Sequence, residues 1–289
     1  MFLRVFIFYH LIFEVLSITK IISINGEVES GPVPTSVDSD TDCPTSCYFN
    51  SDCMLASLAT SGQCSLYLFS ALTTGLKIAK STETTESIVY FKFQVTSSDD
   101  TCSPELNNTN LIFASENGYT YKWEYTKEGF SFPRCRDGWK QFDRSSGVSV
   151  CMTAVGLGNT NKVNAQSACQ KLSGMLIGLE TQVEAQWMWD QIKIQKGYEG
   201  GNYWLAGERI NNPGASGCKT TDFLIKWSDD GMTKGVAITK NTNVSNLSCT
   251  DGKYNEDCFN IINVRGVTIL NDVLCSSSSA NGAICGYKL

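Results

Sequence analysis

Histidine is nearly absent from this sequence. Among 289 residues the single imidazole is that of His10, which lies in an apolar N-terminal stretch. If that stretch is removed or buried in a membrane, Ser-His-Asp and Cys-His catalysis and metal sites built on histidine are excluded together. Also missing are the Gly-x-Ser-x-Gly, P-loop, Asp-[Ser/Thr]-Gly and His-Glu-x-x-His patterns of common enzyme sites. We therefore expect a protein that is not an enzyme.

Basic charge is also in short supply. Lysine and arginine together number 23 against 29 aspartates and glutamates, so the formal net charge is -6. Proteins that bind nucleic acid usually carry a basic patch that neutralises phosphates. We therefore expect no nucleic-acid partner.

Long hydrophobic runs are limited to one, at the N-terminus. Arg4 precedes an apolar run at 5–13, which predicts a secretory signal peptide over 1–26 although Glu14 interrupts the pattern. No Ala-x-Ala box is present. Two places would serve for cleavage: Val15-x-Ser17 and a site near Gly26. The alternative is an uncleaved signal anchor, the only case in which we expect membrane association. The favoured interpretation is a secreted, extracellular protein.

Cysteine, by contrast, is plentiful. The chain has 13 cysteines, which predicts a disulfide framework formed in an oxidising compartment. The N-terminal part holds an odd number of them, so one is left over: Cys43, Cys47, Cys53, Cys64 and Cys102. The first four also suit a cysteine-only zinc site, which the oxidising context disfavours. Three Asn-x-[Ser/Thr] sequons predict N-glycosylation on the same secretory route: Asn107, Asn243 and Asn246.

Polar breaks divide the N-terminal part of the chain. The stretch 27–42 is acidic and rich in Pro, Ser and Thr, so we expect a linker that buries too little to order itself. A small Cys-rich unit is expected over 43–100. Within it, 51–59 suits a short helix, and the alternation of apolar residues over 88–95 predicts a strand.

Two further regions follow. We expect a connecting strand region over 101–132, in which the alternating aromatic residues at 119–125 predict a strand. The last domain is expected over 133–289. Its helical periodicity predicts one helix over 161–172, ended near Gly174, and a second over 180–195.

The second predicted helix carries a capping box and an apolar stripe. Thr181 and Glu184 stand at Thr-x-x-Glu spacing, and Val183, Trp187 and Ile192 are predicted to form the buried face. Short strand-like runs follow it, at 203–207, 223–227, 258–263, 267–270 and 282–287. Two helices followed by several short strands predict an α+β fold.

The C-terminal residues resemble a C-type lectin-like domain. The matching segments, in the family's order, are CRDGWKQF at 135–142, ACQKLSGMLIGLETQVEAQW at 168–187, YWLAGER at 203–209, FLIKWSDDG at 223–231, EDCFNI at 256–261, NDVLC at 271–275 and ICGYKL at 284–289. The Cys-rich unit before them is similar to the PAN-like (CW) module of nematode secreted lectins. The resemblance implies two helices with short antiparallel sheets and a long loop, preceded by a small disulfide-rich α+β module.

The resemblance also implies a disulfide pattern for the eight C-terminal cysteines. The implied pairs are Cys135–Cys151, Cys169–Cys285 and Cys258–Cys275, which leaves Cys218 and Cys249 to pair across the long loop. Bridges that close loops of this length each stabilise a fold by roughly 2–5 kcal/mol.

Sugar-binding members of this family hold a calcium ion through carboxylate and amide oxygens. The resemblance places Glu256, Asn271 and Asp272 at three of the ligand positions. The family's Glu-Pro-Asn or Gln-Pro-Asp tripeptide is missing, because the last proline of the chain is Pro213. Two alternatives therefore remain: a calcium site built on these three residues or, as we expect, no calcium at the sugar site.

Other candidate side chains have structural interpretations that we prefer. Adjacent carboxylates at Asp229 and Asp230 suggest glycoside cleavage, but such a pair after a strand usually forms a solvated turn. Glu184 is better explained by capping than by general-base catalysis. Trp189 is expected to be exposed and available to a partner. Three other tryptophans are expected in the core rather than as sugar platforms: Trp139, Trp204 and Trp227.

Two functions follow from the resemblance. The first is a secreted, non-enzymatic recognition protein that binds glycans through its lectin domain, with a role in innate immunity. The alternative is a calcium-independent protein-binding or structural module that has lost the sugar site. The expected partners are accordingly glycans or a protein ligand.

Overall fold

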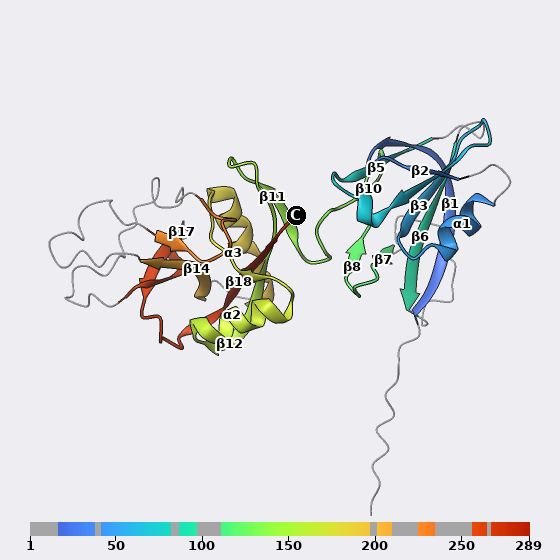
Figure 1. Cartoon of the computed structure of the whole chain (residues 1–289). Coiled ribbons are helices and arrows are strands. Elements are labelled where there is room, and N and C mark those ends of the chain that lie inside the picture. Colours follow the sequence, from blue (N-terminus) through green and yellow to red (C-terminus); the bar gives the residue numbers. More distant parts are fainter. Residues whose placement is uncertain are drawn as a thin grey trace, which may run out of the picture. The chain divides into compact units, whose positions relative to one another are not determined.

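The chain folds into two compact units, Met1–Asp137 and Gly138–Leu289. The computed structural model (Figure 1) describes residues 17–37, 42–81, 87–96, 111–196, 201–209, 225–234, 256–264 and 267–289. Cys102, Cys218 and Cys249 lie outside these ranges, as do the sequons at Asn107, Asn243 and Asn246. No helix in the described ranges is long and apolar enough to cross a membrane.

Strand β1 lies inside the sheet of the first unit. β1 (Ser17–Ser30) pairs antiparallel with β6 (Ile88–Thr96) on one side and with β5 (Leu76–Lys80) on the other. The predicted end of the signal peptide at residue 26 therefore falls in the middle of a strand. Gly26 allows a close approach here, because a Cβ atom at this position would lie 2.4 Å from the Ala79 carbonyl oxygen.

The acidic linker predicted over 27–42 is wrong for its described residues. Glu27 and Glu29 are exposed on β1, whereas Val28 between them packs against the core. Their alternation is that of a strand with one solvated face. Farther along, β2 (Thr35–Val37) pairs with β4 (Cys64–Leu68).

The helix predicted over 51–59 is also wrong, because these residues form β3 (Cys53–Leu58). β3 pairs with β4 on one side and with β6 on the other. Its first four residues, Cys53 to Ala56, are all buried, so both faces of the strand carry buried side chains. A strand covered on both faces is a continuous apolar run, which periodicity alone does not separate from a short helix. The helix lies just before it, as α1 (Cys43–Phe49), followed later by a 3-10 turn, η1 (Phe69–Ala71).

The region predicted as a connection over 101–132 belongs, where described, to the first unit. Its strands are β7 (Ile112–Ala114), β8 (Thr120–Lys122), β9 (Glu124–Tyr125) and β10 (Gly129–Phe132). β7 pairs with β6 and β10 pairs with β5. Trp123 and Phe132 join Phe91 in one aromatic core, and this shared core is why the unit continues to Asp137 rather than ending near residue 100.

Two disulfides hold α1 against the sheet of the first unit. Cys43 is joined to Cys64, and Cys47 is joined to Cys53. The zinc alternative for these four cysteines is therefore wrong, since their sulfurs are bonded to one another.

The sheet of the second unit has the described order β11-β12-β18-β14-β16-β17. Its strands are β11 (Lys140–Asp143), β12 (Ser149–Thr160), β14 (Tyr203–Arg209), β16 (Cys258–Val264), β17 (Val267–Val273) and β18 (Ala280–Lys288). The first long strand, β12, pairs antiparallel with the last, β18, so both ends of the unit meet in its middle. Two short strands lie off this path, β13 (Met175–Leu176) beside β18 and β15 (Ile225–Trp227) beside β14.

Two helices accompany this sheet, close to their predicted positions. α2 (Lys162–Lys171) begins after Asn161, whose side chain accepts a hydrogen bond from the Asn164 amide. α3 (Gln182–Lys196) follows Thr181. The α+β class is therefore confirmed.

The buried face of α3 differs from the predicted stripe. It is formed by Ala185, Met188, Trp189 and Ile192, at i, i+3, i+4 and i+7. Val183 is 69% exposed, and Trp189 is only 3% exposed. The expectation that Trp189 is available to a partner is therefore wrong, because it fills the core.

The disulfides of the second unit include two of the pairs that the family resemblance implied. Cys169 on α2 is bonded to Cys285 on β18, and Cys258 on β16 is bonded to Cys275 after β17. Cys135 and Cys151 are also disulfide-bonded. The α2 helix is thus bonded covalently to β18, and β16 is bonded to the segment that follows β17.

Candidate functional site

The three candidate calcium ligands lie at one end of the β16–β17 hairpin. Asn271 and Asp272 are on β17, opposite Asn260 and Phe259 of β16. Glu256 lies two residues before the start of β16 and is half-buried. Antiparallel pairing therefore brings the three residues to the same end of the hairpin.

Asp272 has a cationic partner, Arg209. Arg209 Nη2 donates to Asp272 Oδ2 at 2.8 Å, and the two side chains are 2% and 1% exposed. The backbone amide of Arg209 donates to the Asp257 carbonyl oxygen at 2.8 Å, which fixes the end of β14 beside the start of β16. A buried charge pair with a charge-assisted hydrogen bond is thus built across the hairpin.

Asn271 has a partner on the neighbouring strand. Its Nδ2 atom donates to Asn260 Oδ1 at 3.0 Å, and Asn260 is fully buried. The Asn271 side chain is therefore held along the sheet by an amide pair rather than left in solution.

This arrangement does not fit a calcium ion. Calcium requires six to eight oxygen ligands, with carboxylates supplying the compensating negative charge. Here the guanidinium of Arg209 already neutralises Asp272, and it would lie beside any cation bound there. Across the described ranges, no group of three or more His, Cys, Asp or Glu side chains is arranged to hold a metal.

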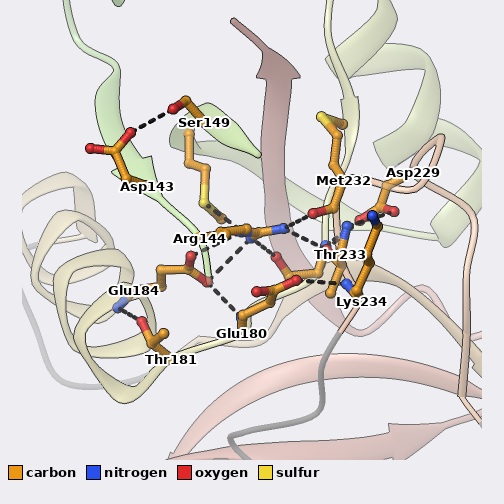
Figure 2. Close-up of polar contacts among 12 residues, drawn as sticks. Asp143, Arg144, Ser149, Glu180, Thr181, Glu184, Asp229, Met232, Thr233 and Lys234 are labelled. Atoms are coloured by element: carbon orange, nitrogen blue, oxygen red, sulfur yellow. Dashed lines mark hydrogen bonds and ion pairs between the residues drawn. The ribbon is translucent and has the colours of Figure 1, made fainter. Parts of the chain in front are cut away.

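Asp229, predicted to lie in a solvated turn, is fully buried, so that prediction is wrong. Figure 2 shows it beside Thr233. Its Oδ2 atom accepts from the Gly178 amide at 3.1 Å and from the Thr233 hydroxyl, and its Oδ1 atom accepts from the Thr233 amide at 3.2 Å. Only Asp230 is exposed, with a positive φ of 53° at the turn. The two adjacent carboxylates therefore do not face a common substrate.

Arg144 is the centre of the surrounding polar contacts, which we call the Arg144 cluster: Arg144, Gly178, Glu180, Glu184, Asp229, Met232 and Thr233. Arg144 Nε and Nη2 donate to the two carboxylate oxygens of Glu184 at 3.0 and 3.2 Å. Nη1 donates to the Met232 carbonyl oxygen at 2.7 Å and to Thr233 Oγ1 at 2.8 Å. Nη2 also donates to the Gly178 carbonyl oxygen at 2.8 Å. One guanidinium thus joins residues 178–184 and residues 232–233 to the end of β11.

Glu184 both caps its helix and joins this cluster. The Thr181 hydroxyl accepts from the Glu184 amide at 3.1 Å, which is half of the predicted capping box. The other half differs, because Glu184 Oε2 accepts from the Glu180 amide at 2.6 Å rather than from Thr181. Glu180 Oε1 in turn accepts from the Lys234 amide at 2.6 Å. The carboxylates serve the fold, and none is poised to accept a proton from a substrate.

Lys162 is a second buried cation near the hairpin. Its Nζ atom donates to the Gly207 carbonyl oxygen at 3.0 Å, to Glu208 Oε1 at 2.9 Å and to Cys258 Sγ at 3.5 Å. Burial lowers the pKa of the Lys162 ammonium, and its hydrogen bond and charge interaction with Glu208 act in the opposite direction. Neither Lys162 nor Arg144 belongs to a motif, so the sequence analysis missed both.

Tryptophans expected in the core lie there or against it. Trp204 is fully buried, and its Nε1 atom donates to the Thr160 carbonyl oxygen at 2.9 Å. Trp139 and Trp227 are partly buried and pack against core residues of the second unit. Trp204 in particular has no face left for stacking on a sugar.

Comparison with known proteins assigns the N-terminal region to a family. Residues 21–93 match the PAN-like domain, so the PAN-like module begins within β1 and not at residue 43. No curated protein matches the chain.

Solved structures are similar to about half of this chain. Herring type II antifreeze protein is 18% identical, with a TM-score of 0.37, over 54% of this chain and 99% of that chain. The C-type lectin domain of murine dendritic cell inhibitory receptor 2, in complex with N-glycan, is 16% identical, with a TM-score of 0.34, over 54% and 99%. The mouse scavenger receptor C-type lectin carbohydrate-recognition domain is 21% identical, with a TM-score of 0.33, over 53% and 98%.

The architecture is a PAN-like domain at 21–93 and an α+β second unit. The second unit has paired terminal strands, two helices and the Cys169–Cys285 bridge. The expected fold class is confirmed on these features.

Proposed function

We propose that this chain is an extracellular, non-enzymatic recognition protein whose C-terminal unit binds its partner without calcium. The observation that carries the proposal is the buried ion pair between Arg209 and Asp272. A guanidinium beside the carboxylate supplies the positive charge that a calcium ion would otherwise supply. The site therefore has no need of the metal to be electrically balanced.

The non-enzymatic part of the proposal rests on the Arg144 cluster. Glu184 and Asp229, the carboxylates considered for general-base or glycosidic chemistry, each accept hydrogen bonds from several donors and are 1% and 0% exposed. A catalytic carboxylate must reach its substrate. The extracellular part rests on the number of disulfides, which persist in oxidising compartments.

Calcium-dependent glycan binding is the second candidate. Glu256, Asn271 and Asp272 favour it, since they stand together at one end of the hairpin in the order that the family resemblance implied. In that case the partner is a glycan, and a role in recognising microbial surfaces would follow. Under the calcium-independent proposal, the partner is a glycan or a protein that is bound without a calcium ion.

Thermal unfolding distinguishes the two candidates. The secreted full chain is melted in millimolar calcium, in magnesium and in chelator. A ligand at 100 times its Kd stabilises a folded state by about 2.7 kcal/mol, which is several degrees for a unit of this size. We expect the melting temperature of the second unit to stay within about 1 °C across the three conditions. A calcium-specific rise of several degrees would overturn the proposal.

Binding provides the second measurement. The chain is applied to a glycan array and to microbial cells, in calcium and in chelator. We expect any binding to have equal strength in both buffers. Binding that chelator removes would support the second candidate instead.

A further inference from the structure

The disulfide between Cys258 and Cys275 differs from three other bridges of the chain: Cys43–Cys64, Cys47–Cys53 and Cys169–Cys285. In those three bridges both cysteines are buried, with at most 3% of any one exposed. In Cys258–Cys275, the Cys258 residue is fully buried, whereas Cys275 is exposed. A thiolate from solution therefore has access to one end of this bridge alone.

A cation lies at the buried end of the same bridge. Lys162 Nζ donates to Cys258 Sγ at 3.5 Å, and the Lys162 residue is itself buried at the start of α2. Two further acceptors, the Gly207 carbonyl oxygen and Glu208 Oε1, hold the ammonium in place. Negative charge that develops on Cys258 Sγ is therefore stabilised by a nearby positive group in a partly water-excluded site.

We propose that Cys258–Cys275 is a thiol–disulfide exchange site for an external dithiol of the Cys-x-x-Cys type, with Cys275 as the attacked sulfur and Cys258 as the leaving group. Exchange is fastest when the attacked sulfur is accessible and the leaving thiolate is stabilised. Cys275 meets the first condition because it is exposed, and Cys258 meets the second because Lys162 lies beside it. The inference goes beyond the proposed function and does not depend on it.

The exchange balances in two steps. A thiolate of the dithiol attacks Cys275 Sγ, a new sulfur–sulfur bond forms, and the Cys275–Cys258 bond breaks with its electron pair passing to Cys258 Sγ. The second thiolate of the dithiol then attacks its own partner in the mixed disulfide and releases Cys275 as a thiolate. The dithiol is oxidised by two electrons, the protein disulfide is reduced by two, and the protein thiolates take protons from water.

The structural consequence is confined to one end of the hairpin. Seven residue pairs from Cys258↔Val273 to Val264↔Val267 hold β16 against β17 without the bridge. Cleavage therefore leaves the hairpin paired and releases the segment that follows Val273. Hydrogen exchange should rise in 274–279 and stay low in the core strand β18.

Selective reduction tests the proposal on the full chain. The oxidised protein is treated with limiting dithiothreitol or with a thioredoxin, the free thiols are alkylated, and peptides are quantified by mass spectrometry. We expect Cys258 and Cys275 to be alkylated at least about tenfold faster than Cys169 and Cys285. A thioredoxin whose second cysteine is replaced by serine should be trapped on Cys275. Equal rates for the two bridges, or trapping on Cys258, would overturn the proposal.

Substitutions test the role of Lys162 separately from the exposure of Cys275. Lys162→Met should slow the cleavage roughly tenfold, while the matched control Lys171→Met, an exposed lysine on the same helix, should leave it unchanged. If Lys162→Met does not fold, as judged by circular dichroism, Glu208→Gln provides the second measurement. That variant removes the competing carboxylate and should speed the cleavage severalfold. An unchanged rate in the variant that folds contradicts the assigned role.

Discussion

Arg209 and Asp272 come from strands that do not pair with each other. Arg209 ends β14, Asp272 lies on β17, and β16 runs between these strands in the sheet. The side chains therefore reach past β16 to meet, with Arg209 Nη2 2.8 Å from Asp272 Oδ2, and both are buried. An ion pair of this kind ties the edge hairpin to the middle of the sheet.

Removing either partner of this pair should destabilise the second unit strongly. Arg209→Met or Asp272→Leu leaves a buried charge uncompensated, and each should cost about 3–5 kcal/mol. The double variant should cost much less than the sum, because no charge remains to be desolvated. Urea unfolding followed by tryptophan fluorescence measures this, since every tryptophan but Trp123 lies in the second unit. Additive losses would show that the two side chains act independently.

The Arg144 cluster predicts a similarly large loss of stability when Arg144, which belongs to no sequence motif, is replaced. Arg144→Met leaves the buried Glu184 carboxylate unpaired and should cost about 3–5 kcal/mol. Lys193→Ala is the matched control. It breaks the ion pair between Lys193 and Asp190, which is exposed, and should cost less than about 1 kcal/mol. Similar losses for the two variants would contradict a central structural role for Arg144.

The elements with strong periodicity were predictable from sequence. The two helices of the second unit and its β14, β16 and β18 strands lie close to their predicted ranges, because each has an apolar pattern and clear end signals. The predicted stripe of α3 is right in part, because Ile192 is fully buried and Trp187 packs against the core. Val183, in the first turn of the helix, faces outward instead.

The errors in the N-terminal unit have a different cause. Glu27 and Glu29 resemble linker residues, yet a strand with one solvated face accepts them at alternate positions. The candidate site was predictable in part. Glu256, Asn271 and Asp272 were located from the family order, but Arg209 was not, because a long-range partner leaves no trace in local spacing.

Lys92 predicts a pH dependence in the first unit. Its Nζ atom donates to the Asn50 carbonyl oxygen at 2.6 Å and to the Cys47 carbonyl oxygen at 3.3 Å, at the C-terminal end of α1. Burial lowers the pKa of Lys92 from its ordinary value of 10.5, and the charge of Asp52 opposes this. Between the lowered folded pKa and 10.5, the unfolded state binds more protons than the folded state. The contribution of Lys92 to the free energy of unfolding should therefore rise with pH across this window.

A comparison with Lys92→Met isolates that contribution. The raised pKa of Tyr67 acts in the opposite direction at alkaline pH, but it is common to both proteins and cancels in their difference. The measurement is chemical unfolding of both proteins as the pH is raised toward 10.5. We expect the wild type to gain stability relative to the variant. Lys77→Met, at an exposed lysine on β5, should show no such trend. A falling difference would reverse the sign that we assign.

The phase of α3 can be tested by paired substitutions. Trp189→Ala opens a cavity in the core of the second unit and should cost about 3–5 kcal/mol. Val183→Ala, on the solvent side of the same helix, should change stability by less than about 0.5 kcal/mol. Thermal unfolding of the two variants under identical conditions decides the matter. If Val183→Ala were the more damaging change, the phase described here would be wrong.

The place of β1 in the sheet predicts where the signal peptide expected from the sequence would be cleaved. Cleavage near Gly26 would delete the residues that pair with β6, from Ser17↔Thr96 to Asn25↔Ile88, and would leave a gap between β5 and β6. Cleavage at the Val15-x-Ser17 site spares nearly all of this ladder. We therefore expect a mature chain that begins no later than Ile18, as measured by N-terminal sequencing of the secreted protein. As a control, chains that start at Ile18 and at Glu27 are secreted behind the same foreign leader. The first should fold and the second should be retained by the cell, because without residues 18–25 the β6 strand loses its β1 neighbour. Efficient secretion of a folded chain that starts at Glu27 would show that β1 is dispensable.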